Sequence, residues 1–306
     1  MFTLPDVTDI VALALAEDFG VEPSRFLANA TPSLDLLDRD VTSSSTIGLD
    51  AQFSGRIVTR QDCVVAGLPL VAAVFDALSA ACGLFDPIEV FPLAAEGARV
   101  AAGTAVAEVS GVAVAVLSGE RTALDFLMLL SGIATETAEW VKDAGPDLKV
   151  CDTRKTSPGM RALSKYAVRV GGGTNHRSGL FDMALVKDNH IRAAGGISRA
   201  LAEARSAHPG LLVEIEADTL AQAVEAAEAG ADIVLLDNMD DAALKVAVAA
   251  VHVAAERRGG TVLTEASGGI TRQRLAGLRA TGVDLVSTSA LTLGTRVIDF
   301  GFDEAR

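Results

Sequence analysis

Six short apolar segments in the second half of the chain constrain its fold most strongly. They are rich in Val, Ile or Leu and lie at 148–152, 183–187, 211–216, 233–237, 262–265 and 285–287. Ala-rich segments with helical spacing, such as 220–229 and 242–257, lie between several of them. Buried strands that alternate with helices are typical of parallel βα units. The second half therefore predicts an α/β domain.

Most of these predicted strands end in a charged or hydroxyl side chain. The ends carry Asp152, Lys187, Glu216, Asp237, Glu265 with Ser267, and Ser287 to Ser289. A single polar strand end needs no explanation beyond its contact with water. A full set of them is what a βα barrel needs to build a site on its C-terminal face. We therefore expect an α/β barrel with a polar site at that face.

The first half of the chain has a different pattern. Helices are expected at 8–17, 69–81 and 121–143, and a turn-rich surface connection at 20–45. The segments with strand character are 51–59, 63–65, 88–91, 105–110 and 112–117. We therefore expect a small α+β domain over residues 1–118, followed by the barrel domain over residues 119–292.

The charge balance argues against two classes of partner. The formal net charge is −14, and a protein this acidic repels nucleic acid and anionic lipid. No apolar run reaches the roughly 20 residues that cross a membrane, because Asp125 and Lys245 interrupt the richest stretches. The first basic residue is Arg25, so the N-terminus lacks the positive region of a secretory signal. These features predict a cytoplasmic protein.

The three cysteines are Cys63, Cys82 and Cys151. An odd number at wide spacings fits neither a disulfide framework nor a zinc pair, so reduced core residues are expected. Cys151 lies beside a charged motif, but we interpret it as a small buried strand residue rather than a catalytic thiol.

Positive charge is concentrated between residues 152 and 191, which hold seven Arg or Lys residues and three acids. A cationic pocket in an acidic protein predicts small anionic ligands, because Arg pairs with carboxylate or phosphate through two hydrogen bonds and Lys acts as a point charge. The residues expected in this pocket are Arg154, Lys155, Arg177 and Lys187. Lys165 and Arg169 lie on an intervening helix, where a solvated basic face is the preferred interpretation.

Two glycine-rich segments are expected to let the backbone approach a ligand. The turn at Gly171 to Gly173 presents Asn175, His176 and Arg177. The segment 265–270 predicts a strand, a glycine turn and a helix, and the segment 287–289 precedes another helix. Together they have the arrangement that binds a terminal phosphate through N–H groups, at the last two strands of a barrel. The alternative is a purely structural turn.

Glu216 and Asp237 are acids among these cations, and a positive pocket keeps both ionised. They suit ribose hydroxyls, either directly or through a hydrated Mg²⁺ ion. Glu214 points to the same side of its strand but one layer deeper, so it ranks lower. A simple salt-bridge role is the alternative for the pair.

At these residues the chain closely resembles the quinolinate phosphoribosyltransferases, also called nicotinate-nucleotide pyrophosphorylases (carboxylating). The resemblance runs from the first helix to the end and is strongest at 119–122, 153–159, 171–177, 187–191, 236–238 and 265–270. It implies an N-terminal α/β-sandwich domain and an incomplete α/β barrel, with the tail at about 293–306 packing on the first domain. It also implies a homodimer, or a higher oligomer built from it.

The resemblance assigns roles to individual residues. The residues implied to face the two carboxylates of quinolinate and the pyrophosphate are Arg154, Lys155, His176, Arg177 and Lys187. Those implied to face the ribose and Mg²⁺ are Glu216 and Asp237, and those implied to bind the 5′-phosphate are Ser267, Gly268 and Gly269. Arg121 is implied to enter the active site of the neighbouring subunit.

The implied reaction joins quinolinate to phosphoribosyl pyrophosphate and yields nicotinate mononucleotide, CO₂ and pyrophosphate, a step of de novo NAD synthesis. The expected catalytic residues are Lys155, Lys187, Glu216 and Asp237, which act by position and charge. Two features depart from the family pattern. Ser289 stands where the family usually has glycine, either crowding the phosphate or donating to it, and residues 21–39 look like an insertion.

Three other functions share parts of this pattern. A related group associated with molybdate-transport operons keeps the Lys-Asp-Asn-His segment poorly, whereas this chain has it intact at 187–190. A nicotinate-specific transferase needs fewer cations because its substrate has one carboxylate. A catalytically silent paralogue that only binds phosphorylated ligands is favoured by Ser289 alone.

Overall fold

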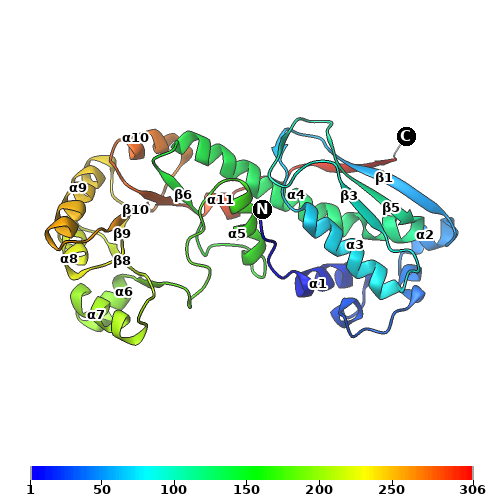
Figure 1. Ribbon diagram of the computed structural model, residues 1–306, viewed down its shortest axis with the longest axis horizontal. Coiled ribbons are helices and arrows are strands. Elements are labelled where there is room, and N and C mark those ends of the chain that lie inside the picture. Colours follow the sequence, from blue (N-terminus) through cyan, green and yellow to red (C-terminus); the bar gives the residue numbers. More distant parts are fainter. Residues whose placement is uncertain (1, 305–306) are drawn as a thin grey trace. The chain divides into compact units, whose positions relative to one another are not determined.

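The computed structural model describes residues 2–304, which form two compact units. The first comprises Met1–Glu136, Ala162–Gly171 and Thr295–Arg306, as far as these are described, and the second comprises Thr137–Arg161 and Gly172–Gly294 (Figure 1). The long helix α4 (Ala113–Ala144) contributes to both. The predicted domain boundaries at residues 118 and 292 stay a prediction. Every described helix is too short or too polar to span a lipid bilayer.

The first unit contains an antiparallel sheet with the strand order β12-β1-β5-β3. Its strands are β1 (Gln52–Thr59), β3 (Glu89–Pro92), β5 (Ala105–Val112) and β12 (Phe300–Glu304). Alternate residues of β1 are buried, at positions 55, 57 and 59, as expected for a sheet that covers a core with one face. The last strand, β12, pairs with β1, so the end of the chain belongs to this unit.

Helices and short strands complete the first unit. They are α1 (Thr8–Phe19), η1 (Pro23–Phe26), η2 (Leu34–Arg39), α2 (Val41–Thr46), β2 (Cys63–Val64), α3 (Leu68–Cys82), β4 (Arg99–Val100) and most of α5 (Arg161–Val170). The helices expected at 8–17 and 69–81 are confirmed as α1 and α3. The expected surface connection at 20–45 is wrong, because η1, η2 and α2 lie there and bury Phe26, Leu36 and Leu37.

The second unit is built on six parallel strands in the order β6-β11-β10-β9-β8-β7. They are β6 (Lys149–Cys151), β7 (Ala184–Val186), β8 (Val213–Ala217), β9 (Ile233–Asp237), β10 (Leu263–Ser267) and β11 (Leu285–Ser287). The edge strands β6 and β7 are not hydrogen-bonded to each other in the described structure, so the barrel is incomplete. The predicted fold class is confirmed.

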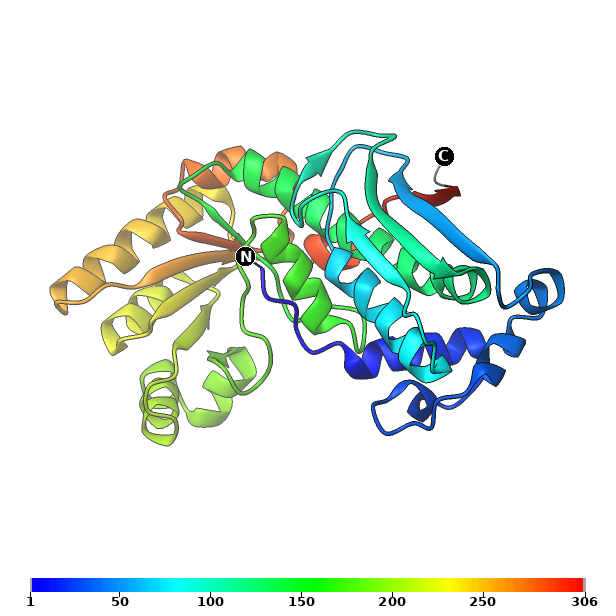
Figure 2. The same ribbon diagram turned by 45° about the vertical axis from the view of Figure 1, so that its right-hand side comes forward.

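Helices connect successive strands of this sheet from β7 to β11. They are α6 (Asp188–Ala194), α7 (Ile197–Ala207), α8 (Leu220–Ala229), α9 (Asp241–Arg257), η3 (Arg272–Arg274) and α10 (Leu275–Arg279), and α11 (Ala290–Leu293) follows the last strand. Helices α8 and α9 pack against the strands on either side of them (Figures 1 and 2). Cys151 lies in the core with Met183, Ile233 and Leu285. All three cysteines are buried, as predicted, and none forms a disulfide among the described residues.

The strand expected at 112–117 is wrong, because α4 begins at Ala113. Residues 113 to 116 are all buried, so the segment is apolar on every side. A short, fully apolar run carries no periodicity that separates a buried helix from a strand.

Candidate active site

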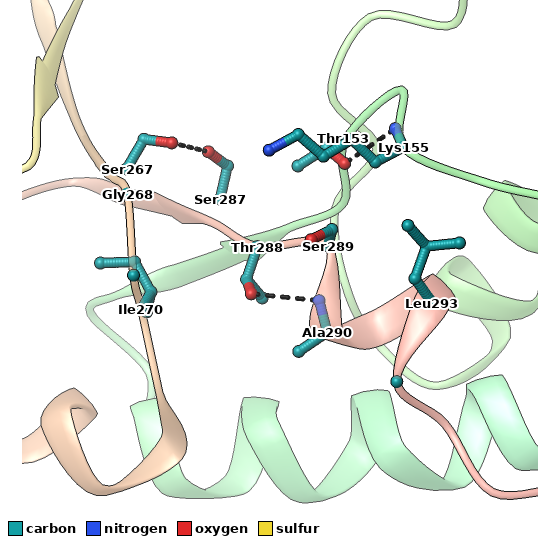
Figure 3. A pocket seen from close by; sticks show the side chains of 12 residues that line it. Thr153, Lys155, Ser267, Gly268, Ile270, Ser287, Thr288, Ser289, Ala290 and Leu293 are labelled. Atoms are coloured by element: carbon teal, nitrogen blue, oxygen red, sulfur yellow. Dashed lines mark hydrogen bonds between the residues drawn. The ribbon is translucent and has the colours of Figure 1, made fainter.

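The strand ends of the second unit bring glycine and hydroxyl residues from β6, β10 and β11 around one cavity of about 380 Å³, here called the glycine-loop pocket (Figure 3). Its lining residues are Thr153, Lys155, Ser267, Gly268, Gly269, Ile270, Ser287, Thr288, Ser289, Ala290, Leu293 and Gly294. The two segments predicted to bind phosphate therefore lie at the same cavity. This follows from the adjacency of β10 and β11 in the sheet.

The walls of the glycine-loop pocket have a defined backbone. Gly268 and Gly269 have φ angles of 87° and 59°, which L side chains rarely adopt, and a Cβ at Gly268 would collide with the side chain of Asn238. The Ser287 hydroxyl donates to the Ser267 hydroxyl at 3.2 Å (Figure 3). The Thr292 hydroxyl donates to the carbonyl of Lys155 at 2.8 Å, which ties α11 to the segment after β6.

A second cavity, here called the cationic pocket, opens beside the first. Its lining residues are Thr153, Arg154, Lys155, His176, Arg177, Leu185, Lys187, Leu235, Glu265, Ser267 and Ser287. Thr153, Lys155, Ser267 and Ser287 line both cavities, so the two form one joined pocket. The four cations predicted from the sequence all line it. Lys155 lies where the two cavities meet.

Two arginines of the cationic pocket, Arg154 and Arg177, lie close enough for their charges to repel, although the charges of Glu214 and Asp182 partly offset this repulsion at Arg177. Nε of Arg154 is buried and has no hydrogen-bond partner among the described residues. Burial, and then the charge of Arg154, hold the pKa of Arg177 below its ordinary value. A buried donor without a partner costs free energy, and two close like charges repel. An anionic ligand relieves both penalties at once.

The acids predicted to face the ribose lie at the ends of β8 and β9. Lys187 donates a short hydrogen bond to Glu216, which connects this acid to the cationic pocket. Burial, and then the negative charge of Glu216, raise the pKa of Asp237. Asn238 donates to Asp237 at 2.5 Å. Two carboxylates that repel each other beside an anion pocket provide hard oxygen ligands of the kind that Mg²⁺ prefers.

His176 is held by groups beneath the cationic pocket. Its backbone N–H donates to Asp152 at 2.9 Å, and its ring Nδ1 accepts from the N–H of Arg177 at 2.8 Å. Its Nε2 lies 3.0 Å from Glu214 and 3.4 Å from Glu265.

Two influences on the His176 ring act in opposite directions. Burial lowers its pKa, but the hydrogen bonding and charge of Glu214 and Glu265 outweigh burial and raise it. The N–H of Arg177 opposes a proton on Nδ1, because a protonated nitrogen cannot accept a hydrogen bond. A proton on Nε2 is compatible with both influences. We therefore take Nε2 to be protonated, whichever influence dominates at Nδ1.

Sequence reasoning missed three acids of this site. Glu214 is fully buried and touches His176, although it was ranked below Glu216 because of its depth. Asp152 and Glu265 are both predicted strand ends, and the sequence assigns neither of them a role in the site. The spacing of two residues between Glu214 and Glu216 was a usable signal, since it places both on the same side of β8.

Two family models match the chain: the C-terminal domain of quinolinate phosphoribosyl transferase over residues 133–303, and its N-terminal domain over residues 40–131. The chain is 40% identical over 265 residues to nicotinate-nucleotide pyrophosphorylase [carboxylating] of Mycobacterium leprae (strain TN), covering 86% of this chain and 90% of that protein. The chain belongs to the quinolinate phosphoribosyltransferase family. The family resemblance seen in the sequence is confirmed.

Other relatives agree with this membership. A probable nicotinate-nucleotide pyrophosphorylase [carboxylating] of Bacillus subtilis (strain 168) is 38% identical, covering 88% of this chain and 89% of that protein. The crystal structure of NadC from Streptococcus pyogenes superposes with a TM-score of 0.84 at 34% identity, covering 97% of this chain and 95% of that one. A human nicotinic acid phosphoribosyltransferase structure is only 15% identical, so it shares the fold alone.

The structure also places three other residues that the sequence singled out, Arg121, Ser289 and Lys165. Arg121 lies on α4 in the first unit, and its side chain is exposed. Its guanidinium lies 3.6 Å from the carboxylate of Asp125. Ser289 lines the glycine-loop pocket with φ −82° and ψ −7°, a conformation that any residue adopts. The expectation that Lys165 faces solvent is wrong, because it is only 3% exposed.

Proposed function

We propose that the joined pocket transfers the phosphoribosyl group of phosphoribosyl pyrophosphate to quinolinate, the reaction of the family to which the chain belongs. The products are nicotinate mononucleotide, CO₂ and pyrophosphate, which places the enzyme in de novo NAD synthesis. One observation carries the proposal: the buried Nε of Arg154 has no hydrogen-bond partner among the described residues and lies beside Arg177, in a cationic pocket that joins the glycine-loop pocket.

The two carboxylates of quinolinate account for the number of cations. Arg154 and Arg177 each offer a planar group that binds a carboxylate through two hydrogen bonds, and a substrate with one carboxylate needs only one of them. His176 and Lys187 line the same cavity. The dianion is therefore the ligand whose charge and size match the cationic pocket best.

Phosphoribosyl pyrophosphate extends from this pocket into the glycine-loop pocket. We assign its 5′-phosphate to Ser267, Gly268, Gly269 and Ser289, where a glycine backbone allows close approach. Lys155 lines both cavities and is assigned to the pyrophosphate. The ribose then lies between the two anion sites, towards Glu216 and Asp237.

The chemistry needs position and charge rather than a nucleophilic side chain. The pyridine nitrogen attacks the anomeric carbon while the bond to pyrophosphate breaks, and positive charge develops on the ribose. Glu216 and Asp237 stabilise that positive charge, whereas Lys155 and Lys187 stabilise the leaving pyrophosphate. The 2-carboxylate then leaves as CO₂, and the electron pair of the broken bond stays on the ring carbon C2, where the adjacent positively charged nitrogen stabilises it. A proton from solvent then adds to C2 and completes nicotinate mononucleotide.

Glu216 and Asp237 are the residues that would hold Mg²⁺, directly or through water. The raised pKa of Asp237, caused by burial and by Glu216, fits a site that is completed by a cation. When bound, Mg²⁺ supplies positive charge that neutralises the pyrophosphate.

We also propose that the protein acts in the cytoplasm.

We propose a homodimer, or a higher oligomer built from it, with an active site shared between subunits. Arg121 is exposed on the first unit, and Asp125, with which it forms an ion pair, is itself exposed and one helical turn away. Such a weak pairing leaves Arg121 available to a neighbouring subunit's site, which is the role that the family resemblance implies.

The test incubates purified protein with Mg²⁺, phosphoribosyl pyrophosphate and either quinolinate or nicotinate, and measures nicotinate mononucleotide and CO₂. We expect product from quinolinate only, and loss of product when EDTA removes the metal. Product from nicotinate instead would identify the nicotinate-specific alternative. A folded protein that binds phosphoribosyl pyrophosphate but forms no product from either acid would identify a silent paralogue.

A further inference from the structure

Two fully buried glutamates lie beneath the cationic pocket without a role in the proposed reaction. Glu214 on β8 and Glu265 on β10 are each 0% exposed. Their carboxylate oxygens have no hydrogen bond of good geometry among the described residues. The group that approaches both is Nε2 of His176, at 3.0 Å and 3.4 Å.

A pair of buried acids is expensive for a fold. Removing carboxylates from water costs several kcal/mol each, and replacing buried charged groups by apolar residues is often neutral or stabilising. Leucine or valine at these two positions would therefore pack in the core of the barrel without the cost of burying a charge. The presence of two buried acids around one imidazole therefore points to a role other than stability.

The contacts around His176 define that purpose. Nδ1 accepts from the N–H of Arg177, so Nε2 carries the ring proton and directs it at the two glutamates. The backbone N–H of His176 is held by Asp152. The contacts at Nδ1, at Nε2 and at the backbone N–H thus hold His176 in place. Because Nδ1 accepts from the N–H of Arg177, the ring in turn holds the backbone of Arg177, which carries the guanidinium.

We propose that Glu214 and Glu265 are positioning residues that hold the Nε2–H of His176, so that His176 and Arg177 form a preformed receptor for an aromatic dicarboxylate. The three groups also lie close enough to share a metal ion. The proton on Nε2 occupies the lone pair that a metal would need, so a close contact of Nε2–H with the two carboxylates is the interaction that these distances favour. The choice of ligand rests on the proposed function, whereas the ring geometry does not.

Steady-state kinetics of two variants test the positioning role. Glu214→Leu removes the nearer acceptor, and we expect KM for quinolinate to rise at least about tenfold while kcat and KM for phosphoribosyl pyrophosphate change less than about threefold. Glu214→Gln keeps an acceptor for Nε2–H and offers its amide to Glu265, so it should restore KM to within about threefold of wild type. Equal damage from both variants would overturn the proposal.

A matched control separates positioning from general damage to the barrel. Thr264 is also fully buried in β10, where its hydroxyl donates to Asp284 at 2.7 Å, away from the contacts of His176. Thr264→Val should leave KM for quinolinate within about twofold of wild type. If it raises KM as much as Glu214→Leu does, the effect of Glu214→Leu is structural and the positioning role fails.

Nitrogen-15 NMR of labelled histidine tests the ring geometry without enzyme activity. The chain has only 4 histidines, and a His176→Asn variant assigns the signal. We expect a protonated Nε2 in wild type and Glu214→Gln from pH 6 to 8, and a shifted or exchange-broadened signal in a folded Glu214→Leu. An unprotonated or metal-bound Nε2 in wild type would refute the proposal, whether or not the protein turns over quinolinate.

Discussion

At the scale of single residues, Arg154 offers the sharpest test of ligand binding. Its buried, unpartnered Nε fits a carboxylate that uses the planar guanidinium, which a lysine cannot reproduce. We expect Arg154→Lys to raise KM for quinolinate by about tenfold to a hundredfold, because a charge-assisted contact worth about 1.5 to 3 kcal/mol is lost. Steady-state kinetics with saturating phosphoribosyl pyrophosphate measure this.

Arg192 provides the matched control for that substitution. It is an exposed arginine on α6, and Asp188 lies 3.9 Å away. Arg192→Lys should leave KM for quinolinate within about twofold of wild type, because exposed ion pairs contribute little. An Arg154→Lys variant with normal KM would show that the guanidinium does not contact the dicarboxylate.

Ser289 gives a second prediction at this scale. Its backbone is in the right-handed helical region, so glycine is not required there, and its side chain lines the glycine-loop pocket. We expect the hydroxyl to donate to the 5′-phosphate, so that Ser289→Ala and Ser289→Gly both raise KM for phosphoribosyl pyrophosphate about threefold to tenfold. A lower KM in Ser289→Gly than in wild type would indicate that the Cβ crowds the ligand.

The residues of the site divide into those that sequence can reveal and those that it cannot. The positions of Lys187 and Asp237 at strand ends were predictable, because a full set of charged or hydroxyl residues that end apolar strands indicates the C-terminal face of a barrel. The contact of Glu265 with His176 could not be predicted from the sequence, because the two residues are 89 positions apart and come together only in the folded sheet. Lys165 was misplaced because helical spacing shows amphipathicity but not what covers the polar side.

At the scale of elements, the N-terminus of α3 shows how a buried acid can hold a helix. Glu96 accepts from the N–H groups of Gly67 and Leu68 at 2.6 Å and 3.1 Å, and from the Tyr166 hydroxyl at 2.7 Å. Burial raises the pKa of Glu96, although these hydrogen bonds act in the opposite direction. The folded state therefore binds the proton of Glu96 more tightly than the unfolded state.

The sign of the resulting pH dependence follows from linkage. Stability from a raised carboxyl pKa is present at low pH and declines as pH rises through the folded pKa. Glu96→Gln cannot titrate, so we expect the variant to gain stability relative to wild type as pH rises from about 4.5 upward. Urea unfolding at several pH values, with exposed Glu89→Gln as control, measures the difference. A difference independent of pH would contradict the raised pKa.

Element prediction succeeded where periodicity was clear and failed where it was not. The parallel strands and α3 were located to within about three residues at each end because their apolar patterns are bounded by turn residues. The prediction of a surface connection at 20–45 is wrong because its apolar side chains are spaced by polar residues, yet Leu36 and Leu37 are buried. Short 3₁₀ helices carry too few turns to show a repeating face.

At the scale of the whole molecule, the net charge and the charge of the pocket have opposite signs and affect different ligands. The chain carries −14 overall, yet the cavity that we assign to two anionic substrates is lined by Arg154, Lys155, Arg177 and Lys187. These four cations gather at one pocket, while the net negative charge of the chain repels polyanions such as nucleic acid. Selection for small anions over large ones thus follows from where the charges lie.

Arg121 and Lys187 belong to different units of the chain, which allows a test of the shared active site. If Arg121 serves the neighbouring subunit, Arg121→Ala and Lys187→Ala homodimers are both inactive. A mixed dimer has one site with both residues intact, because the Lys187→Ala subunit supplies Arg121 to the site of its partner. Random exchange makes half the dimers mixed, so roughly a quarter of wild-type activity should return.

The experiment mixes equal amounts of the two purified variants under conditions that allow subunit exchange and follows product formation with time. Activity should rise from near zero as mixed dimers form, and each variant alone should stay inactive. Lys155→Ala mixed with Lys187→Ala is the control, because both changes lie in the same pocket and no mixed dimer has an intact site. If Arg121→Ala is inactive but never complements Lys187→Ala despite exchange, then Arg121 acts within its own chain.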